Sequence, residues 1–258
     1  MTTAPAPLRF CDLTLGYHRH PAVHHLAGAV AAGTLLAVVG PNGAGKSTLC
    51  KGIVGLMAPL SGSIERTCAV RDIAYLPQVA EIDRSFPINV YDLVAMGLWR
   101  RVGPFSAVTA ADRARIDHAI ATVGLTGFER RPIAALSGGQ LQRVLFARLL
   151  LQDAAVIVLD EPFNAMDDRT VADLVGLVEY WHREGRTVLA ALHDLALVTA
   201  HFPQTLLLAR EPVAWGETRA VLTPDNLIKA QRMCEAFEET AAECAAATIG
   251  AAAPRPPH

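Results

Sequence analysis

Two short glycine-bearing stretches of this chain have residue types suited to binding anions. GPNGAGKST occupies residues 40–48, and LSGGQLQR occupies residues 136–143. Each stands at the start of an expected helix, where unpaired backbone N–H groups and the helix dipole attract negative charge. The first also fits the pattern G-x-x-x-x-G-K-[ST] and follows an apolar run, which is the context that a phosphate-binding loop needs. The chain therefore has two candidate sites for phosphate groups.

The first stretch predicts a site for ATP and Mg²⁺. Backbone N–H groups from Gly43 to Thr48 would converge on the β-phosphate. Lys46 would bridge the β- and γ-phosphates, and the Ser47 hydroxyl would bind Mg²⁺. The alternative is a chance glycine-rich turn, expected on the order of once in a thousand such sequences because lysine is scarce here. The expected ATP contacts in this loop are Gly40, Pro41, Asn42, Gly43, Ala44, Gly45, Lys46, Ser47 and Thr48.

Polar residues at the ends of apolar runs supply further groups for phosphate chemistry. Asp160 and Glu161 close VIVLDE, and Gln78 closes IAYLPQ. Asp160 and Gln78 would bind Mg²⁺, and Glu161 would act as the general base on an attacking water. His193 closes another run and would hold the γ-phosphate and the water in line. A solvated strand end is the ordinary interpretation of each residue alone, and the phosphate loop makes the catalytic interpretation preferable.

Tyr17 is a candidate for binding the base of the nucleotide. It lies upstream of the phosphate loop, where a strand leads into a loop. An aromatic ring there can stack on adenine, because stacking needs a flat π-face and no specific hydrogen bonds. Packing in the core is the alternative interpretation.

The apolar pattern predicts strands that alternate with helices, and hence a parallel sheet. Short strands are expected within 8–39, and the later strands at 34–40, 70–78, 154–162 and 186–194. The expected helices are 46–57, 138–152 and 170–184, with another helix after Thr223. Residues 79–135 have a helical pattern, in which Thr109 is the expected N-cap of one helix. The fold class is α/β, with an inserted helical block.

Composition excludes several classes of protein. The 258 residues are 52% hydrophobic with a net charge of −2, which argues against disorder and against binding to nucleic acid. The five cysteines form no CxxC pair, so neither a disulfide framework nor a zinc knuckle is expected. No secretory signal is expected at the N-terminus, and the longest uncharged stretch, Leu26 to Gly45, is too interrupted for a membrane span.

The motifs together resemble the nucleotide-binding subunit of ATP-binding cassette (ABC) transporters. They are the phosphate loop, Gln78, LSGGQ, VIVLDEP, Asp167 and His193, in that order. The resemblance implies a P-loop NTPase core with an N-terminal antiparallel β subdomain and an inserted α-helical subdomain. It places the ATPase domain at 8–222, with the helical subdomain at about 79–135. Residues 223–258 are expected to form a C-terminal helix and a disordered tail.

The resemblance also assigns the second glycine stretch. In the family, this loop caps the γ-phosphate of ATP held by the other subunit of a head-to-tail pair, which here implies Ser137, Gly138, Gly139 and Gln140. The residues alone leave open whether the anion belongs to the same chain. The family usually has Ser-Ala-Leu-Asp after the catalytic glutamate, whereas this chain has NAMD. Asp167 keeps the position implied in communication across the dimer, and Asn164 is expected to retune one contact.

The implied function is an ATPase that drives an importer. Its partners would be a second copy and a multi-span permease at the cytoplasmic face of the membrane, and indirectly a substrate-binding protein. The wording DxxFPINVxDLVxMG within 82–105 is similar to ATPase subunits of manganese and zinc importers. Importers of iron-siderophores and cobalamin share much of it and are the alternative. About half of the apolar side chains in this stretch are expected only to pack the subdomain, and the others to form a permease groove. The candidates are Phe86, Val90, Tyr91, Leu93, Met96, Leu98 and Trp99.

Two further interpretations are less favoured. His18, His20, His24 and His25 are clustered, but clustering alone does not produce tetrahedral zinc geometry, and solvated histidines between two antiparallel strands explain it. A cassette ATPase that acts on DNA or ribosomes is a different class of function. The chain has a single cassette and neither a heptad arm nor a basic patch, which argues against that class.

Overall fold

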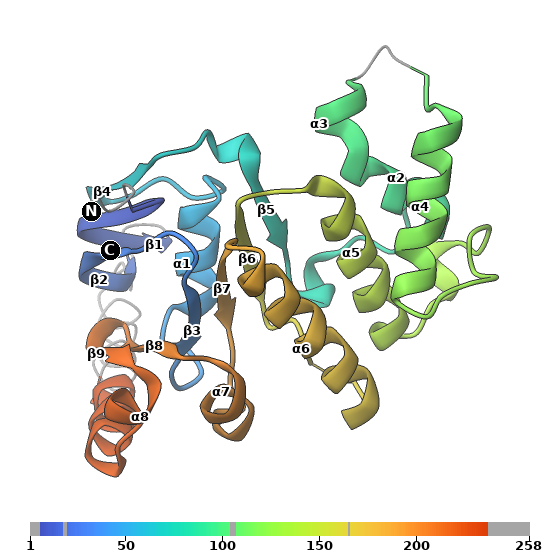
Figure 1. Cartoon of the computed structure of the whole chain (residues 1–258). Helices are drawn as coiled ribbons and strands as arrows, with labels where there is room; N and C mark the ends of the chain where they lie inside the picture. Colours follow the sequence, from blue (N-terminus) through green and yellow to red (C-terminus); the bar gives the residue numbers. More distant parts are fainter. Residues whose placement is uncertain (1–5, 18–19, 104–106, 165, 237–258) are drawn as a thin grey trace, which may run out of the picture.

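The computed structural model describes residues 6–17, 20–103, 107–164 and 166–236 (Figure 1). In this part of the chain, the main sheet has the strand order β5-β6-β7-β3-β8-β9. The strands are β3 (Leu35–Val39), β5 (Ile73–Leu76), β6 (Val156–Asp160), β7 (Thr187–Ala191), β8 (Gln204–Ala209) and β9 (Glu211–Glu217). All neighbouring pairs are parallel except β8 and β9. The expected α/β class and parallel sheet are confirmed.

The central strands are apolar throughout because both faces of the sheet are covered. Every residue of β3, β6 and β7 is buried. Successive residues of β6 enter different cores: Ile157 packs on the helical side, and Val158 packs toward the antiparallel sheet. This burial holds the carboxyl ends of the strands, where the polar residues stand, in a fixed arrangement.

A second sheet lies beside the main one and is antiparallel. Its strands are β1 (Leu8–Tyr17), β2 (His20–Val30) and β4 (Ser61–Arg66), in the order β2-β1-β4. Helix α1 (Lys46–Ile53) contributes Leu49 and Ile53 to the core that the two sheets share. Figure 1 shows α1 in light blue between the antiparallel strands and β3. The phosphate loop thus lies where the two sheets meet.

Two long helices cover the other face of the main sheet. They are α5 (Gly138–Gln152) and α6 (Asp168–Arg183), and the α5 bounds are those expected from the sequence. Phe146 of α5 stacks on Trp181 of α6 with ring centroids 6.1 Å apart and planes 7° apart. Both side chains are fully buried. Two shorter helices, α7 (Leu195–His201) and α8 (Thr218–Val221), follow.

Residues between β5 and α5 are mainly helical and form the end of the molecule farthest from the antiparallel sheet (Figure 1). The α-helices are α2 (Val90–Ala95), α3 (Trp99–Val102) and α4 (Ala110–Thr122), with short 3₁₀ turns η2 (Val79–Glu81), η3 (Met96–Leu98) and η4 (Ile133–Ala135). Thr109 caps α4, because its side chain accepts from the Asp112 N–H while Asp112 accepts from the Thr109 N–H. The predicted N-cap is confirmed.

Some predicted bounds were too long. Helix α1 ends at Ile53 and not at residue 57, because Gly55 follows with a left-handed φ of 71°, which ends a helix. Strand β5 begins at Ile73, since a 3₁₀ turn, η1 (Val70–Asp72), precedes it. A helix after Thr223 is confirmed for residues 224–236, and the predicted tail beyond it lies outside the described residues. Within the described ranges, no helix is both long enough and apolar enough to cross a membrane.

Candidate nucleotide-binding site

The phosphate loop connects β3 to α1 and has a backbone that only glycine adopts easily. Gly45, the residue before α1, has φ 93°, in the left-handed region. A Cβ on Gly45 would stand 2.3 Å from the Ala22 carbonyl oxygen of β2, which is closer than real atoms approach. The glycine therefore lets the loop bend close against β2 while the first N–H groups of α1 face the cavity.

Lys46 is buried at the start of α1, and its ammonium group is held by the loop itself. Its Nζ donates to the carbonyl oxygens of Gly40, at 2.8 Å, and Pro41, at 3.0 Å. Burial lowers the pKa of Lys46, and the nearby carboxylates of Glu161 and Asp160 oppose that shift. A phosphate group would replace two neutral acceptors with charged ones, which are stronger partners for an ammonium group.

Ser47, Gln78 and Asp160 form one hydrogen-bonded network, although they are far apart in sequence. The Ser47 Oγ donates to Asp160 Oδ1 at 2.9 Å, and the Gln78 Nε2 donates to Ser47 Oγ at 2.9 Å. Burial is the main cause that raises the pKa of Asp160 to about 6, while the Ser47 hydrogen bond opposes the rise. The adjacent charge of Glu161 adds to it. The structure therefore places these three candidate residues next to one another.

The donor set of this network suits a small divalent cation. Asp160 is fully buried, and its Oδ2 has no hydrogen-bond partner within the described part of the chain. A buried, unpaired carboxylate oxygen is costly unless a positive charge or a donor reaches it. A hydroxyl, an amide and a carboxylate are oxygen ligands of the kind that Mg²⁺ binds, directly or through water.

Glu161 stands between two cavities. The first, of about 360 Å³, is lined by residues 42–48 together with Ala22, Gln78 and Glu161. The second, of about 270 Å³, is lined by Glu161, Asn164 and His193 among others. Glu161 has a left-handed backbone with φ 50°, held by its N–H donating to the Ala191 carbonyl at 3.1 Å. The Asn164 amide donates to Glu161 Oε2, so the residue that departs from the family pattern contacts the proposed base.

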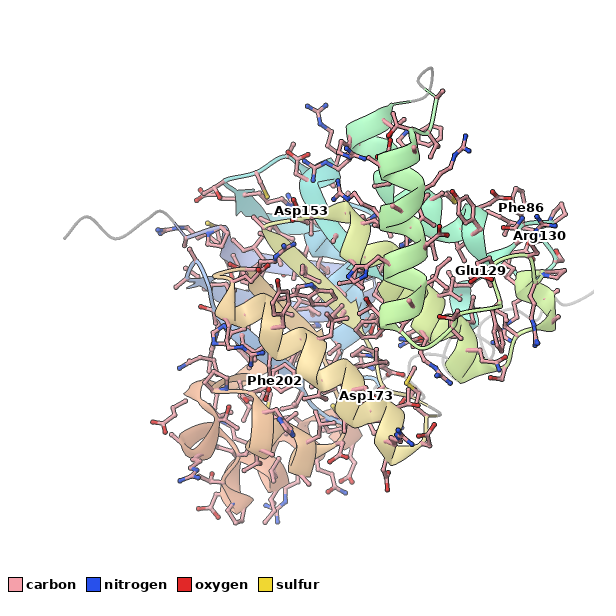
Figure 2. All side chains as sticks on the ribbon, turned by 45° about the vertical axis from the view of Figure 1, so that its right-hand side comes forward. Phe86, Glu129, Arg130, Asp153, Asp173 and Phe202 are labelled. Atoms are coloured by element: carbon pink, nitrogen blue, oxygen red, sulfur yellow. The ribbon has the colours of Figure 1, made fainter. Side chains whose placement is uncertain are left out.

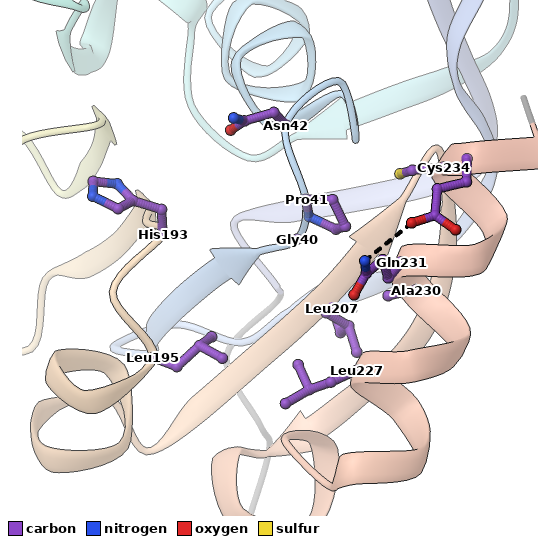
Figure 3. Close-up of a pocket in the computed structure, with 11 residues that line it drawn as sticks. Gly40, Pro41, Asn42, His193, Leu195, Leu207, Leu227, Ala230, Gln231 and Cys234 are labelled. Atoms are coloured by element: carbon purple, nitrogen blue, oxygen red, sulfur yellow. Dashed lines mark hydrogen bonds between the residues drawn. The ribbon is translucent and has the colours of Figure 1, made fainter. Parts of the chain in front are cut away.

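His193 lies on the same side of the sheet as the phosphate loop. It follows β7 by two residues and is exposed. A pocket of about 500 Å³ extends from His193 past Gly40 and Pro41 to residues 227–235 of the last described helix. Figure 3 shows the phosphate-loop residues between His193 and that helix. His193 thus lies near the phosphate loop, and it lines the smaller cavity together with Glu161.

Tyr17 ends β1 and is 48% exposed, so it is not a core residue. Of the histidine cluster, His18 lies outside the described residues. His25 Nδ1 is 2.9 Å from Asp12 Oδ1, and both residues have left-handed backbones where β1 and β2 shift register. Among the described residues, no group of three or more histidine, cysteine or carboxylate side chains could hold a metal ion.

The second glycine stretch forms a different kind of helix start. Ser137 is exposed and caps α5: its Oγ accepts from the Gln140 N–H at 3.2 Å, while Gln140 Oε1 accepts from the Ser137 N–H at 3.0 Å. Gly138 and Gly139 form its first turn, whose N–H groups have no intrahelical acceptors. Residues 137–140 are not among the described residues that line the phosphate-loop cavity.

Asp167 is the N-cap of α6, a role that the motif did not indicate. Its carboxylate accepts from the Thr170 N–H at 2.9 Å and from the Thr170 hydroxyl at 2.8 Å. These hydrogen bonds lower the pKa of Asp167. Asp167 is exposed, so it remains accessible to a second molecule.

Of the seven candidate docking residues of the helical block, three are exposed, three are buried, and Tyr91 is partly buried. Phe86, Met96 and Trp99 are 62%, 48% and 62% exposed. Figure 2 shows Phe86 at the outer edge of the block. Val90, Leu93 and Leu98 are buried in the core. These three form the core of the helical block against α5, in agreement with the alternative that about half of the seven only pack this block.

Sequence reasoning missed two sets of residues around the site. Lys51 of α1 pairs with Glu81, three residues after Gln78, with Nζ 2.5 Å from Oε1. Burial is the main cause that raises the pKa of Tyr75, and the neighbouring Asp160 adds to the rise. The only sequence signal for the Lys51–Glu81 pair is its spacing, with Glu81 three residues after Gln78 and Lys51 four residues after Ser47.

The enclosed phosphate loop beside Asp160 and the separate, open helix start at Ser137 are the arrangement expected of an ATP-binding cassette. The sequence profile described as ABC transporter matches residues 23–164. A manganese transport system ATP-binding protein of Synechocystis is 37% identical over 80% of this chain and 82% of its own length. The zinc transport system ATP-binding protein TroB of Treponema pallidum is 38% identical, over 85% and 84%. The chain belongs to the ABC transporter family and is a transport ATPase.

Solved structures agree with this assignment. A chain of a metal-chelate type ABC transporter in an inward-facing conformation has a TM-score of 0.74 and 31% identity, covering 86% of this chain and 87% of that one. The ADP-bound cassette MJ1267 has a TM-score of 0.73 at 19% identity, covering 88% and 99%, and supports the fold alone. The names of the similar transport proteins specify manganese or zinc as the metal that those proteins' systems transport.

Proposed function

We propose that this protein hydrolyses ATP to drive the import of manganese or zinc through a membrane permease, working as a dimer with two ATP molecules at its interface. The observation that supports it most directly is the division of the anion-binding parts. The phosphate loop, Ser47 and Asp160 form one half-site, and the exposed Ser137 helix start forms another that does not line the same cavity. A head-to-tail pair brings the two halves together.

Within one half-site, each side chain has a distinct role. Lys46 leaves the carbonyl oxygens of its own loop for the β- and γ-phosphates. Ser47, Gln78 and Asp160 would hold Mg²⁺, which would neutralise charge on the phosphates when bound. Glu161 accepts a proton from the attacking water, and His193 contacts the γ-phosphate. Tyr17 stacks on adenine, its exposed ring being free for that contact.

The second half-site acts from the partner. The N–H groups of Gly138 and Gly139, together with the Ser137 hydroxyl, bind the γ-phosphate held by the other copy. Gln140 keeps Ser137 oriented through the capping box. Asp167 and Asn164 lie on the segment that follows Glu161, and they carry the contact with the partner back to the base.

The chain divides by role along its length. Residues 8–222 form the ATPase unit, and residues 79–135 form its helical insertion. Phe86, Met96 and Trp99 of the insertion offer exposed apolar surface to a short permease helix at the cytoplasmic face of the membrane. An ATPase that works without a membrane protein would not need this surface. Copurification with a multi-span membrane protein separates the two possibilities.

A chelate importer is the second candidate, because a transporter of the metal-chelate type is among the similar solved structures. The relatives named for manganese and zinc favour free ions, and they match at 37–38% identity over four fifths of the chain or more. Uptake of Mn²⁺, Zn²⁺ and an iron chelate, measured separately in cells without this protein, decides between them. Loss of chelate uptake alone would contradict the free-ion assignment.

The dimer is tested with Glu161→Gln, which keeps the shape of the base and removes its function. With saturating ATP and Mg²⁺, this variant is expected to sediment as a dimer, and the same variant carrying Lys46→Ala is expected to stay monomeric. A Glu161→Gln protein that binds ATP yet remains a monomer at all protein concentrations would contradict the proposal.

A further inference from the structure

Two contacts join α1 to the turn that follows β5, and they lie one above the other. Ser47 contacts Gln78 at 2.9 Å, and Lys51 contacts Glu81 at 2.5 Å. Ser47 and Lys51 are four residues apart on α1, so they share one face of the helix. Glu81 is one 3₁₀ turn beyond Gln78, and its N–H donates to the Gln78 carbonyl at 3.0 Å. Moving Glu81 therefore moves Gln78.

The ion pair is better placed than an ordinary surface pair. The side chains of Lys51 and Glu81 are 23% and 34% exposed, against 61% and 64% for Arg9 and Glu65, whose charged atoms are 3.6 Å apart. The hydrogen bond to Glu81 is the largest cause that raises the pKa of Lys51. Lys51 also stands in the last turn of α1, where the helix dipole favours a cation. Partial burial reduces solvent screening, so this pair can restrain the backbone.

The first contact cannot hold Gln78 throughout the reaction. The Ser47 hydroxyl is shared between Gln78 and Asp160, and a bound cation would take its oxygen. Lys51 and Glu81 are outside the described lining of the phosphate-loop cavity, so nucleotide need not disturb them. We propose that the Lys51–Glu81 ion pair is a positioning contact that keeps Gln78 beside the phosphate-loop helix when Ser47 turns to the cation. The role toward the cation rests on the proposed function, whereas the restraint itself does not.

The restraint is tested first without nucleotide, by hydrogen–deuterium exchange of the backbone amides in residues 78–82. Lys51→Glu and Glu81→Lys each place like charges together, and each is expected to speed exchange there by about fivefold or more. The double variant Lys51→Glu with Glu81→Lys restores an opposite pair and is expected to return within about twofold of the parent. Glu65→Gln, in the exposed pair, is the control and is expected to change nothing in this segment.

The positioning role is tested by the Mg²⁺ dependence of ATP hydrolysis. Each single variant is expected to raise the Mg²⁺ concentration for half-maximal activity by about fivefold, with the double variant recovering most of the loss. Unchanged exchange in the single variants, or no recovery in the double variant, overturns the proposal. If the double variant restores exchange but the single variants leave the Mg²⁺ dependence unaltered, the role toward Gln78 is overturned. A parent protein without Mg²⁺-dependent ATPase counts against the proposed function, and the exchange data then still decide on the restraint.

Discussion

The two glycine-rich helix starts look alike in sequence and differ in the structure. The start of α1 is enclosed: Lys46 is buried, Gly45 lies against β2, and the Ser47 hydroxyl is already hydrogen-bonded to Asp160. The start of α5 is open, with Ser137 exposed and capped by its own Gln140. The start of α1 is thus an enclosed binding site, whereas the start of α5 is an exposed helix terminus.

The difference teaches that the same dipole can serve two purposes. Burial on several sides lets the phosphate loop bind a ligand by itself, because the loop lines a cavity that Ala22, Gln78 and Glu161 also enclose. An open helix start satisfies its donors with side chains and water until another molecule covers it. Four experiments test this comparison, from the largest expected effect to the smallest.

Removing the charge from the enclosed start is expected to have the largest effect. Lys46→Ala should lower the ATPase rate by about a thousandfold, because no other described side chain replaces its charge on the phosphates. Lys229→Ala, an exposed lysine on the last described helix, is the matched control and should leave the rate unchanged. Steady-state phosphate release measures both. A Lys46→Ala protein with more than a tenth of the parent rate would contradict the enclosed-site account.

Ser137→Phe removes the hydroxyl and blocks the open helix start of α5. This variant should lower the ATPase rate by about a hundredfold, while the affinity of the monomer for ATP should stay within about twofold of the parent. Mixing this variant with Lys46→Ala sharpens the comparison. In a mixed dimer, one site combines both defects and the other has none. About a quarter of the parent single-turnover activity should return at random pairing. Without recovery, the two starts act within one chain. Ser63→Ala, on exposed β4, is the control.

In the absence of nucleotide, the buried carboxylate of Asp160 is expected to lower the free energy of unfolding at neutral pH. Because the pKa of Asp160 is raised to about 6, folding favours the protonated form. Its contribution to stability is therefore fully present below the unfolded pKa of about 4 and is lost as pH rises through about 6. Asp160→Asn should raise the free energy of unfolding by about 2 kcal/mol at pH 7.5 and by little at pH 4.

Urea unfolding of the nucleotide-free protein at the two pH values measures this effect of Asp160→Asn. Asp173→Asn, on the exposed face of α6 (Figure 2), is the control and should show no comparable change. Equal stabilisation at both pH values would show that Asp160 carries no buried charge. The expected gain should also disappear when Mg²⁺ and ATP are present, because a cation offsets the cost of the carboxylate.

The smallest effect is expected where the enclosed site meets the segment that leads to the partner. Asn164→Ser removes the amide that donates to Glu161 and restores the residue usual in the family. We expect kcat to fall about threefold with the ATP dissociation constant unchanged, since one orienting hydrogen bond to a carboxylate is lost. A change in ATP affinity without a change in kcat would show that Asn164 acts on binding instead.

Much of the fold was predictable because its signals are local. The bounds of α5 and the capping box of Thr109 follow from side chains a few residues apart. The apolar runs of β3 and β6 predict burial on both faces, which the structure confirms. The premature end of α1 depended on the conformation of Gly55, which a helical pattern does not reveal. The sequence did not indicate which of the seven candidates form the core, as Val90, Leu93 and Leu98 do, because an apolar side chain can face either a core or a partner.

The amino-acid sequence alone determined the chemistry of the site: a lysine and a serine after glycines, an acidic pair after an apolar run, and a serine that caps a helix. These features depend only on residue type and short spacing, so they can be identified without the tertiary structure. Only the tertiary structure decided which of these groups meet. Ser47, Gln78 and Asp160 touch because parallel strands bring distant segments to one edge of a sheet, and the same packing joins Lys51 to Glu81. It also leaves Ser137 exposed, because the buried residues of α5 begin only at Leu141, one turn after the N-cap.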